Sequence, residues 1–260
     1  MIEEIKKEEK NKYGISVDEM AQAGVNFGHK KSKLHPKMEP YLFGIRNMVH
    51  IIDLEKIVKK FEEALDFIAK EVSEGKTILF VGNKIQVKDL IEEVAEDTAS
   101  PYITGRWIGG TFTNFTVIKK RVAHLKKLES DKEKGEWDKY TKKERLGFEK
   151  EIVDLTNKFG GIKDMDKLPD MIFITDLSCD GLALSEAIKM KVPIIAITDT
   201  NTNPNLVKYP IPGNDDAVPS LRYILEKIEN VILANKRVAP KVEKVGKTTD
   251  NKEDIKNQEK

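Results

Sequence analysis

Cysteine and long apolar runs are what this 260-residue sequence most clearly lacks. Its single cysteine, Cys179, excludes an internal disulfide framework and a cysteine zinc cluster, and it is typical of a reducing compartment. No apolar run approaches the roughly 18 to 20 residues of a membrane helix. The charged start, Met1 to Lys10, matches neither a secretory nor a transit peptide. We therefore expect a cytoplasmic protein without a membrane partner.

Net charge is also nearly absent, because 45 basic residues stand against 44 acidic ones. Taken alone, this balance argues against nucleic-acid binding, for which a basic domain is the usual signature. The charges are unevenly distributed, however. Residues 28–50 contain five bases and one acid, and residues 104–128 contain six bases and no acid. Most such runs are solvated helix faces, so a binding role needs support from the surrounding residues.

Near-continuous apolar segments at 77–82, 171–175 and 193–198 are typical of strands buried on both faces of a parallel sheet. Apolar residues at helical spacing, such as those from Leu182 to Ile188, lie between them. This alternation predicts an α/β fold with a doubly wound parallel sheet. The predicted boundaries are 16–112 and 161–236 for this domain, 113–160 for an inserted segment, 1–15 for a mobile N-terminal extension and 237–260 for a disordered C-terminal tail.

Local signals place further elements along the chain. Ser16 and Glu19 form a capping box that predicts a short helix, and Asp53 is a cap for a helix that reaches about Val72. The extended apolar stretches on either side of Arg46-Asn47 predict a β-hairpin. A last helix is expected from the caps Asn214 and Asp215 to about Asn235.

Residues 113–160 do not follow the alternation of strands and helices. One narrow apolar stripe runs from Ile118 to Leu128, a second runs from Ile152 to Phe159, and a capping box at Thr141 begins the second helix. This pattern predicts an inserted antiparallel helical hairpin with a coiled-coil seam. Trp137 and Tyr140 lie near its tip, where they either staple the two helices together or anchor a protein partner.

Catalytic motifs are missing at the predicted strand ends. Gly82-Asn-Lys84 supplies neither a dinucleotide-binding turn nor a P-loop. Asp176, Asp180 and Asp199 follow the other strands, where acids serve acid–base or magnesium chemistry but are also ordinary turn residues. The spacing of the histidines at 29, 35 and 50 matches no metal-ligand pattern, and nearby lysines repel cations. We therefore predict no enzyme, no cofactor and no metal.

The two basic segments favour RNA as the partner. Phe27 to Met38 combines lysines and imidazoles with glycine and proline, which suits a loop that donates to phosphate oxygens. Gly105 to Asn114 combines arginine, aromatic rings and glycines, which suits irregular RNA with exposed bases. Trp107 and Phe112 are equally compatible with a place in the core. The predicted RNA-binding residues are Lys30, Lys31, Lys33, His35, Lys37, Arg46, Arg106, Trp107, Asn114, Lys119, Lys120 and Arg121.

At these segments the chain resembles the ribosomal protein S2 family of the small ribosomal subunit, in its bacterial form. The motifs that carry the resemblance occur in the family's order over about residues 16–237. They are Phe27-Gly-His29, Pro36-Lys-Met38, Phe43-Gly44, Arg46-Asn47, His50-Ile-Ile-Asp53, Arg106-Trp-Ile-Gly-Gly-Thr-Phe-Thr-Asn114, Gly160-Gly-Ile-Lys-Asp-Met165, Pro169 to Pro193 with Glu186, Asp199-Thr-Asn201 and Pro212-Gly-Asn-Asp-Asp216.

The resemblance implies a flavodoxin-like domain with a protruding coiled-coil hairpin and no enzymatic activity. It also implies a structural component that binds small-subunit ribosomal RNA near the junction of head and body, beside neighbouring ribosomal proteins, and that helps to dock ribosomal protein S1. The chain departs from the family at Leu177 to Asp180 and at His35, where asparagine is common. Contacts made by the 177–181 loop are therefore not carried over.

Two other classes of function remain open at this point. Because a fold does not decide a function, a small-molecule enzyme with the same architecture is one alternative. Its signature would be a phosphate-binding turn after the strand at 77–82, which Gly82-Asn-Lys84 does not supply. A non-ribosomal adaptor that uses the helical hairpin is the other alternative.

Overall fold

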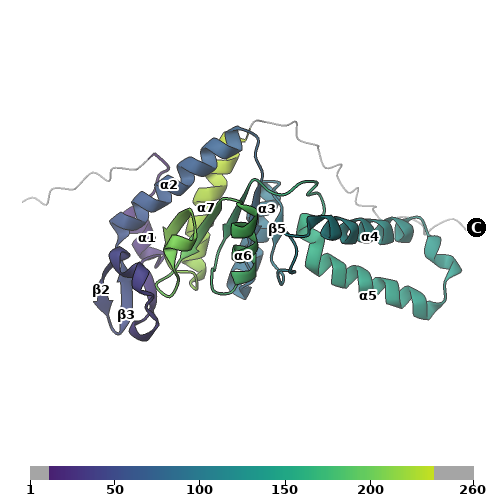
Figure 1. Ribbon diagram of the computed structural model, residues 1–260, viewed down its shortest axis with the longest axis horizontal. Helices are drawn as coiled ribbons and strands as arrows, with labels where there is room; N and C mark the ends of the chain where they lie inside the picture. The colour runs from purple at the N-terminus through teal and green to yellow at the C-terminus, as the bar shows by residue number, and fades with distance from the viewer. Residues whose placement is uncertain (1–11, 237–260) are drawn as a thin grey trace, which may run out of the picture.

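The structure is a computed structural model that describes residues 12–236 (Figure 1). The predictions for residues 1–11 and for the tail at 237–260 lie outside the described residues. The main sheet has five parallel strands, as the apolar segments predict. In spatial order they are β5 (Tyr102–Ile103), β4 (Ile78–Val81), β6 (Met171–Ile174), β7 (Ile194–Thr198) and β8 (Tyr209–Pro212).

Helices cover both faces of this sheet, which confirms the doubly wound α/β fold. Phe80 on β4 belongs to one buried core, while its neighbours Leu79 and Val81 belong to the other, because successive strand residues point to opposite faces. The first core is closed by α2 (Leu54–Ser73), α3 (Ile85–Asp97) and α7 (Val218–Asn235). The second is closed by α6 (Gly181–Met190) and the base of the inserted segment.

A small antiparallel sheet precedes the α/β domain and contains the predicted hairpin. Its strands lie in the order β1 (Phe27–Lys30), β3 (Val49–Ile52) and β2 (Leu42–Arg46). The hairpin turns at Asn47 and Met48, whose φ angles are 50° and 63°. Two short 3-10 helices, η1 (Lys31–Lys33) and η2 (Pro36–Tyr41), connect β1 to β2.

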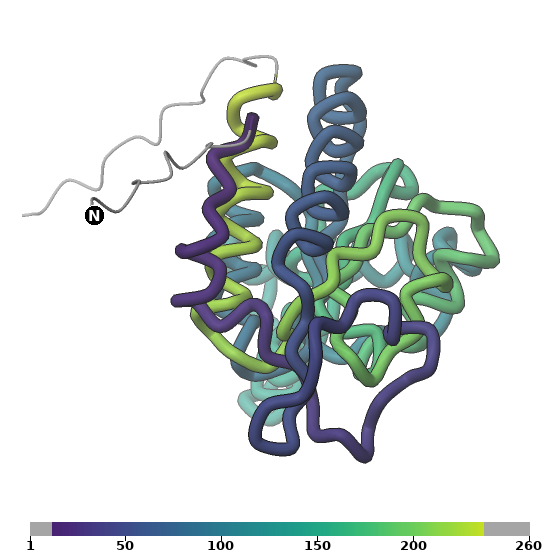
Figure 2. Tube along the Cα trace, turned by 90° about the vertical axis from the view of Figure 1, so that its left-hand side faces the viewer, coloured from purple at the N-terminus to yellow at the C-terminus, as the bar shows by residue number. Residues whose placement is uncertain are grey.

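The N-terminal residues of the described chain pack against the domain. Helix α1 (Val17–Gln22) is capped by Ser16, whose side chain accepts from the Glu19 N–H. Ile15 is buried, and Lys227 Nζ donates to the Gly14 carbonyl at 2.6 Å. Figure 2 shows this purple segment alongside the yellow α7. Gly14 and Ile15, which the sequence analysis assigns to the N-terminal extension, therefore contact the domain.

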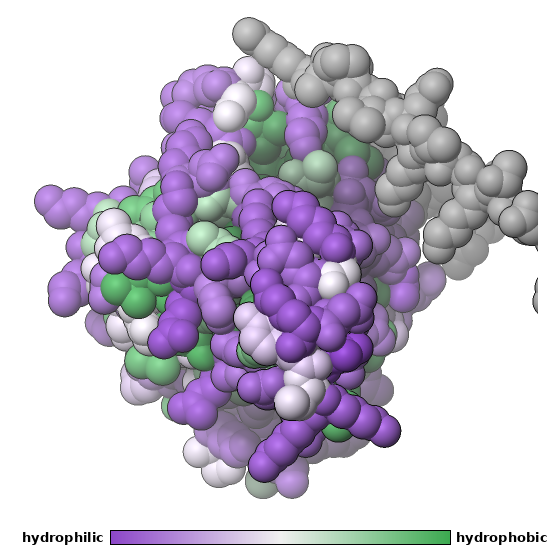
Figure 3. Space-filling view, turned by 90° about the vertical axis from the view of Figure 1, so that its right-hand side faces the viewer, coloured by the Kyte–Doolittle hydropathy of each residue, from purple (hydrophilic) through white to green (hydrophobic). Residues whose placement is uncertain are grey.

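The inserted segment consists of two antiparallel helices, α4 (Phe115–Glu133) and α5 (Lys142–Phe159), which project away from the sheet (Figure 1). We call this pair of helices the arm, and the residues that connect them its tip. Between them is η3 (Glu136–Lys139), and η4 (Gly160–Ile162) follows α5. Both hydrogen bonds of the predicted capping box at Thr141 are present. The coiled-coil geometry of the pair stays a prediction. Figure 3, seen from this end, shows a mostly hydrophilic surface.

Within residues 12–236, no helix combines the length and apolar character needed to cross a membrane.

Candidate nucleic-acid interface

The loop between β1 and β2 is held by its backbone and by one buried side chain. The His35 N–H donates to the Thr200 carbonyl at 2.8 Å, and the Lys31 N–H donates to the Met48 carbonyl at 2.9 Å. Met38 is completely buried. His35 Nδ1 also accepts from the Lys37 N–H at 3.2 Å. These contacts fix the path of the loop while its lysine side chains stay outside.

Five of the predicted RNA-binding bases are exposed together on this loop and the adjacent hairpin. None of them has an acidic side chain at ion-pair distance among residues 12–236, so each remains available to an anionic ligand. We call this set the loop surface. It consists of Lys30, Lys31, Lys33, Lys37 and Arg46.

Two apolar side chains lie beside the loop surface and were not among the predicted site residues. Phe43 is 80% exposed and Met48 is 68% exposed, both on the hairpin that carries Arg46. An exposed ring on the same hairpin as an exposed guanidinium is suited to stacking on an unpaired base. The sequence gives Phe43 as part of a family motif, but it does not show that its ring points into solvent.

The second basic segment begins with a tight turn organised by Glu186. This carboxylate accepts from the N–H groups of Gly110 at 2.6 Å, Phe112 at 2.9 Å and Thr113 at 3.2 Å. Burial alone would raise the pKa of Glu186, but these three donated hydrogen bonds hold the pKa below its ordinary value. Gly110 has a φ of 95°, which only glycine adopts readily. Glu186 therefore sets the shape of the loop that carries Arg106.

The prediction that Trp107 binds RNA is corrected by its burial. Its side chain is only 3% exposed, and its ring meets Phe112 edge to face with centroids 5.1 Å apart. A ring in this position packs the core and is not available to stack on a base. Arg106, the preceding residue, is exposed.

The remaining predicted residues lie at the start of α4. Asn114 precedes the helix, and Lys119, Lys120 and Arg121 are exposed on its first turns. Lys119 Nζ donates to the Asp166 carbonyl at 2.8 Å, so part of its charge is already engaged. We call this set the arm surface. It consists of Arg106, Asn114, Lys119, Lys120 and Arg121.

The loop surface and the arm surface lie at opposite edges of the main sheet. The loop surface is fixed to Thr200, which follows β7 next to the β8 edge of the sheet. The arm surface follows β5, which is the opposite edge. In Figure 1 the β2–β3 hairpin and α4 accordingly lie toward opposite ends of the long axis.

The carboxyl ends of the strands hold a half-buried lysine, Lys84, among acidic side chains. Strand order reverses between β4 and β6, the place where open α/β sheets usually bind ligands. Lys84 Nζ lies 2.8 Å from carboxylate oxygens of Asp176 and Asp215, and 2.7 Å from Asp216. Burial raises the pKa of Asp180 to about 7. Asp176 is thus an internal ion-pair partner, which is the structural role that the sequence left open.

Sequence comparison places the chain among known proteins. The sequence pattern of the family described as "Ribosomal protein S2" matches residues 20–235. The chain belongs to this family. A relative from Dictyoglomus thermophilum is 44% identical over 227 residues, covering 87% of this chain and 92% of the relative. A relative from Nitratiruptor is 42% identical over 224 residues, covering 86% of this chain and 84% of the relative.

Both relatives, and a third from Dictyoglomus turgidum at 43% identity, are named "Small ribosomal subunit protein uS2". Membership in the ribosomal protein S2 family confirms the resemblance on which the sequence analysis relied. It also confirms that the chain is not an enzyme, because the family is a structural one.

Proposed function

We propose that the protein is a structural constituent of the small ribosomal subunit, in the cytoplasm, and that it binds ribosomal RNA through the loop surface. The observation that carries the proposal is the exposure of five basic side chains without acidic partners among residues 12–236. They are mounted on a loop whose path is fixed by hydrogen bonds to Thr200 and Met48. A rigid array of this kind binds phosphates without a large loss of loop entropy.

The loop surface also carries a means of contacting bases. Phe43 and Arg46 lie on the same strand, β2, and both are exposed. Lysines contribute point charges to the phosphate backbone, while a ring and a guanidinium plane stack on unpaired bases. The loop surface therefore matches an irregular, partly single-stranded region of RNA better than a regular duplex.

The arm surface supplies a second, weaker contact in this proposal. Arg106, Lys120 and Arg121 have no acidic side chain at ion-pair distance among the described residues, whereas Lys119 is engaged with Asp166. Because the two surfaces lie at opposite edges of the sheet, they contact separate parts of the RNA. A protein that bridges two RNA regions suits the predicted location at the junction of head and body.

Docking of ribosomal protein S1 belongs to the same proposal. We assign it to the tip of the helical hairpin, where the sequence analysis leaves open a staple between the helices or an anchor for a protein partner. The structure favours Tyr140 over Trp137 for this role. Tyr140 is 38% exposed, while Trp137 is 7% exposed and packs on Phe148 with ring centroids 5.4 Å apart. Trp137 thus packs between the two helices, whereas part of the Tyr140 side chain stays exposed to a partner.

Co-sedimentation tests the proposed function directly. Purified protein is mixed at moderate salt with small ribosomal subunits that lack it, and with large subunits as the control. We expect saturable binding of one copy per small subunit and little binding to large subunits. Adding ribosomal protein S1 should then increase its retention on the reconstituted particles. Equal sedimentation with both subunits, or none, would contradict the proposal.

A further inference from the structure

We propose that Asp180 carries a proton in the folded protein and forms an acid–amide pair with Asn83. Asn83 follows the end of β4, and Asp180 directly precedes α6, so the pair joins the carboxyl end of a central strand to the start of a helix. Asn83 Nδ2 donates to Asp180 Oδ1, which is one of the two hydrogen bonds of such a pair. Both residues lie outside the loop surface and the arm surface.

The other two oxygens of this contact indicate where the proton lies. Asp180 is only 1% exposed, and its Oδ2 has no hydrogen-bond partner among residues 12–236. Asn83 Oδ1 is also buried and also without a partner in this part of the chain. Buried acceptors are rarely left unsatisfied, because the loss of hydration costs free energy. A proton on Asp180 Oδ2, donated to Asn83 Oδ1, satisfies both atoms at once.

The position of Asp180 before α6 gives independent support. An ionised aspartate at a helix N-cap normally accepts from N–H groups of the first turn, where the helix dipole favours negative charge. The side chain of Asp180 makes no such hydrogen bond. Its carboxyl group contacts Asn83 instead. A carboxyl group that leaves the N–H groups of its own helix unused is expected to be neutral.

The neighbouring carboxylate, Asp176, has the partners that Asp180 lacks. Its Oδ1 accepts from the N–H groups of Ser178 at 2.6 Å and Cys179 at 3.2 Å, and its Oδ2 lies 2.8 Å from Lys84 Nζ. Burial alone would raise the pKa of Asp176, but its contacts with Lys84 and Cys179 hold the pKa below its ordinary value. Asp176 therefore keeps its negative charge.

The groups around Asp180 favour its neutral form. Burial makes the largest contribution, and the negative charge of Asp176 adds to it, so the pKa of Asp180 rises to about 7. The hydrogen bond from Asn83 and the charge of Lys84 oppose this rise, but the Lys84 ammonium is also paired with two other carboxylates. The Cys179 thiol adds no charge, because its contact with Asp176 and its burial raise its pKa to about 11.

The pair gives a role to the segment from Leu177 to Asp180, in which the chain departs from its family. Helix α6 begins directly after this segment and carries Glu186, which holds the turn of the arm surface. Loss of the proton above about pH 7 leaves the carboxylates of Asp176 and Asp180 facing each other at the start of this helix. The pair is thus a pH-sensitive link between the sheet and the helix that shapes the arm surface.

Urea denaturation at a series of pH values tests the proton by comparing the parent chain with Asp180→Asn, whose amide donates to Asn83 Oδ1 without titrating. The folded parent holds a proton that its unfolded form releases above the ordinary pKa of 3.8. Relative to the variant, its unfolding equilibrium constant should therefore rise about tenfold per pH unit from pH 5 to pH 7 and level off above. Asp166→Asn, at a side chain that is 98% exposed, is the matched control, and its ratio to the parent should stay constant.

NMR of the full chain with ¹³C-labelled aspartate reads the proton directly. The carboxyl signal that is missing from the spectrum of Asp180→Asn should titrate with a midpoint near pH 7. Asn83→Ala separates pairing from burial. With Asn83 present, Asp180→Asn should melt at a higher temperature than Asp180→Ala, because two amides also form a pair, and in the Asn83→Ala background this advantage should disappear.

Three results would overturn the proposal. The first is a midpoint below pH 5 for the Asp180 carboxyl group. The second is a ratio of unfolding constants between the parent chain and Asp180→Asn that does not change with pH. The third is an advantage of asparagine over alanine at position 180 that survives the removal of the Asn83 side chain.

Discussion

The two basic segments, 28–50 and 104–128, are similar in the sequence but differ in the folded protein. In the first, all five bases are exposed and have no acidic partner among residues 12–236. In the second, folding brings acids from beyond the segment to its side chains. Lys119 lies beside Asp166, and Lys126 Nζ lies 3.0 Å from Asp164. A run without acids in the sequence is therefore not the same as a surface without acids.

The supports of the two segments differ as well. The first is a loop tied to the ends of the parallel strands, with Met38 as its buried anchor. The second begins with a turn whose N–H groups converge on the nearly buried Glu186, and its aromatic residue Trp107 is inside the core. The bases of the loop surface thus project from a loop that backbone hydrogen bonds hold in place. In the second segment, several side chains instead pack in the core or form ion pairs within the protein.

Trp107→Ala should give the largest effect, and it tests whether this ring belongs to the core. Truncation of a buried aromatic ring removes its contacts and leaves a cavity, so we expect the free energy of unfolding to fall by about 3–5 kcal/mol. Urea denaturation measures the change. Trp107→Phe, which keeps part of the contact with Phe112, should lose distinctly less. Unchanged stability in the alanine variant, with weaker RNA binding, would instead support a stacking role.

Glu186→Ala should have the next largest effect, because it leaves the N–H groups of Gly110, Phe112 and Thr113 without their acceptor. We expect a loss of about 1–3 kcal/mol in unfolding free energy. Glu133→Ala, at an exposed position near the end of α4, is the control and should change little.

The pH dependence of stability sharpens this test. Because the pKa of Glu186 is held below its ordinary value of 4.5, its stabilising effect is present above that pH and is lost as the pH falls through the folded-state pKa. The difference in unfolding free energy between the parent chain and Glu186→Gln should therefore shrink in acid. A constant difference from neutral pH to acid would show that the charge of Glu186 does not matter.

Shortening the arm should have the smallest effect on stability. Replacing residues 131–140 with a short glycine-containing turn removes Trp137 and Tyr140 but keeps the ion pair of Glu129 with Lys163. We expect the melting temperature to change by less than about 4 °C, because few contacts of the sheet depend on the tip. Leu128→Ala, in the buried seam, should lower it more. A large drop on shortening would show that the tip supports the domain.

Most of the fold follows from the sequence because buried parallel strands consist of unbroken apolar residues. The segments at β4, β6 and β7 have this signature, and all three were predicted. The two edge strands lack it. β5 has only two residues, and β8 contains two prolines, which edge strands tolerate because one side needs no ladder hydrogen bonds. Helix α7 begins at Val218, later than predicted, because Asn214 Oδ1 accepts from the N–H groups of Asp216 and Ala217 in a turn before it.

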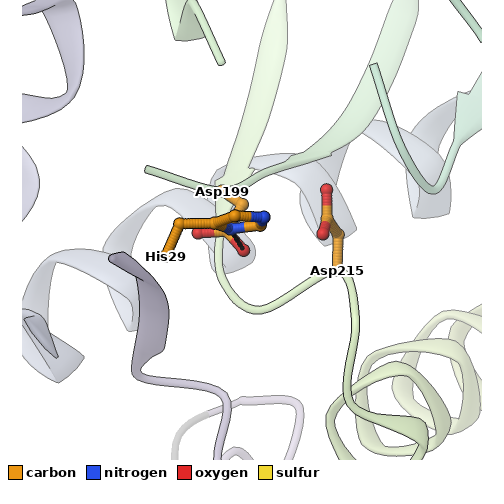
Figure 4. Close-up of side chains that lie close together, drawn as sticks. All are labelled: His29, Asp199 and Asp215. Atoms are coloured by element: carbon orange, nitrogen blue, oxygen red, sulfur yellow. Dashed lines mark hydrogen bonds and ion pairs between the residues drawn. The ribbon is translucent and has the colours of Figure 1, made fainter. Parts of the chain in front are cut away.

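The site was less predictable because it depends on contacts between distant residues. Exposure of the loop lysines follows from a local loop, and charge counting found them. The burial of Trp107 and the acids beside Lys119 and Lys126 depend on how the inserted helices return to the sheet. The approach of His29 to Asp199 and Asp215 depends on packing between segments that lie 170 or more positions apart in the chain (Figure 4).

The most direct test of the account is the salt dependence of binding to small-subunit ribosomal RNA. One variant replaces Lys30, Lys31, Lys33 and Lys37 with glutamine. Its matched control makes the same change in net charge at four lysines that are ion-paired in the structure. These are Lys76, Lys126, Lys158 and Lys163.

Each lost phosphate contact should flatten the plot of log affinity against log salt concentration by roughly 0.7 to 0.9. The loop variant should therefore lower the slope by about 3, and the control should lower it by much less than 1. Circular dichroism melts of both variants verify that they fold. An unchanged slope in the loop variant, or an equal change in the two variants, would contradict the assignment of RNA binding to the loop surface.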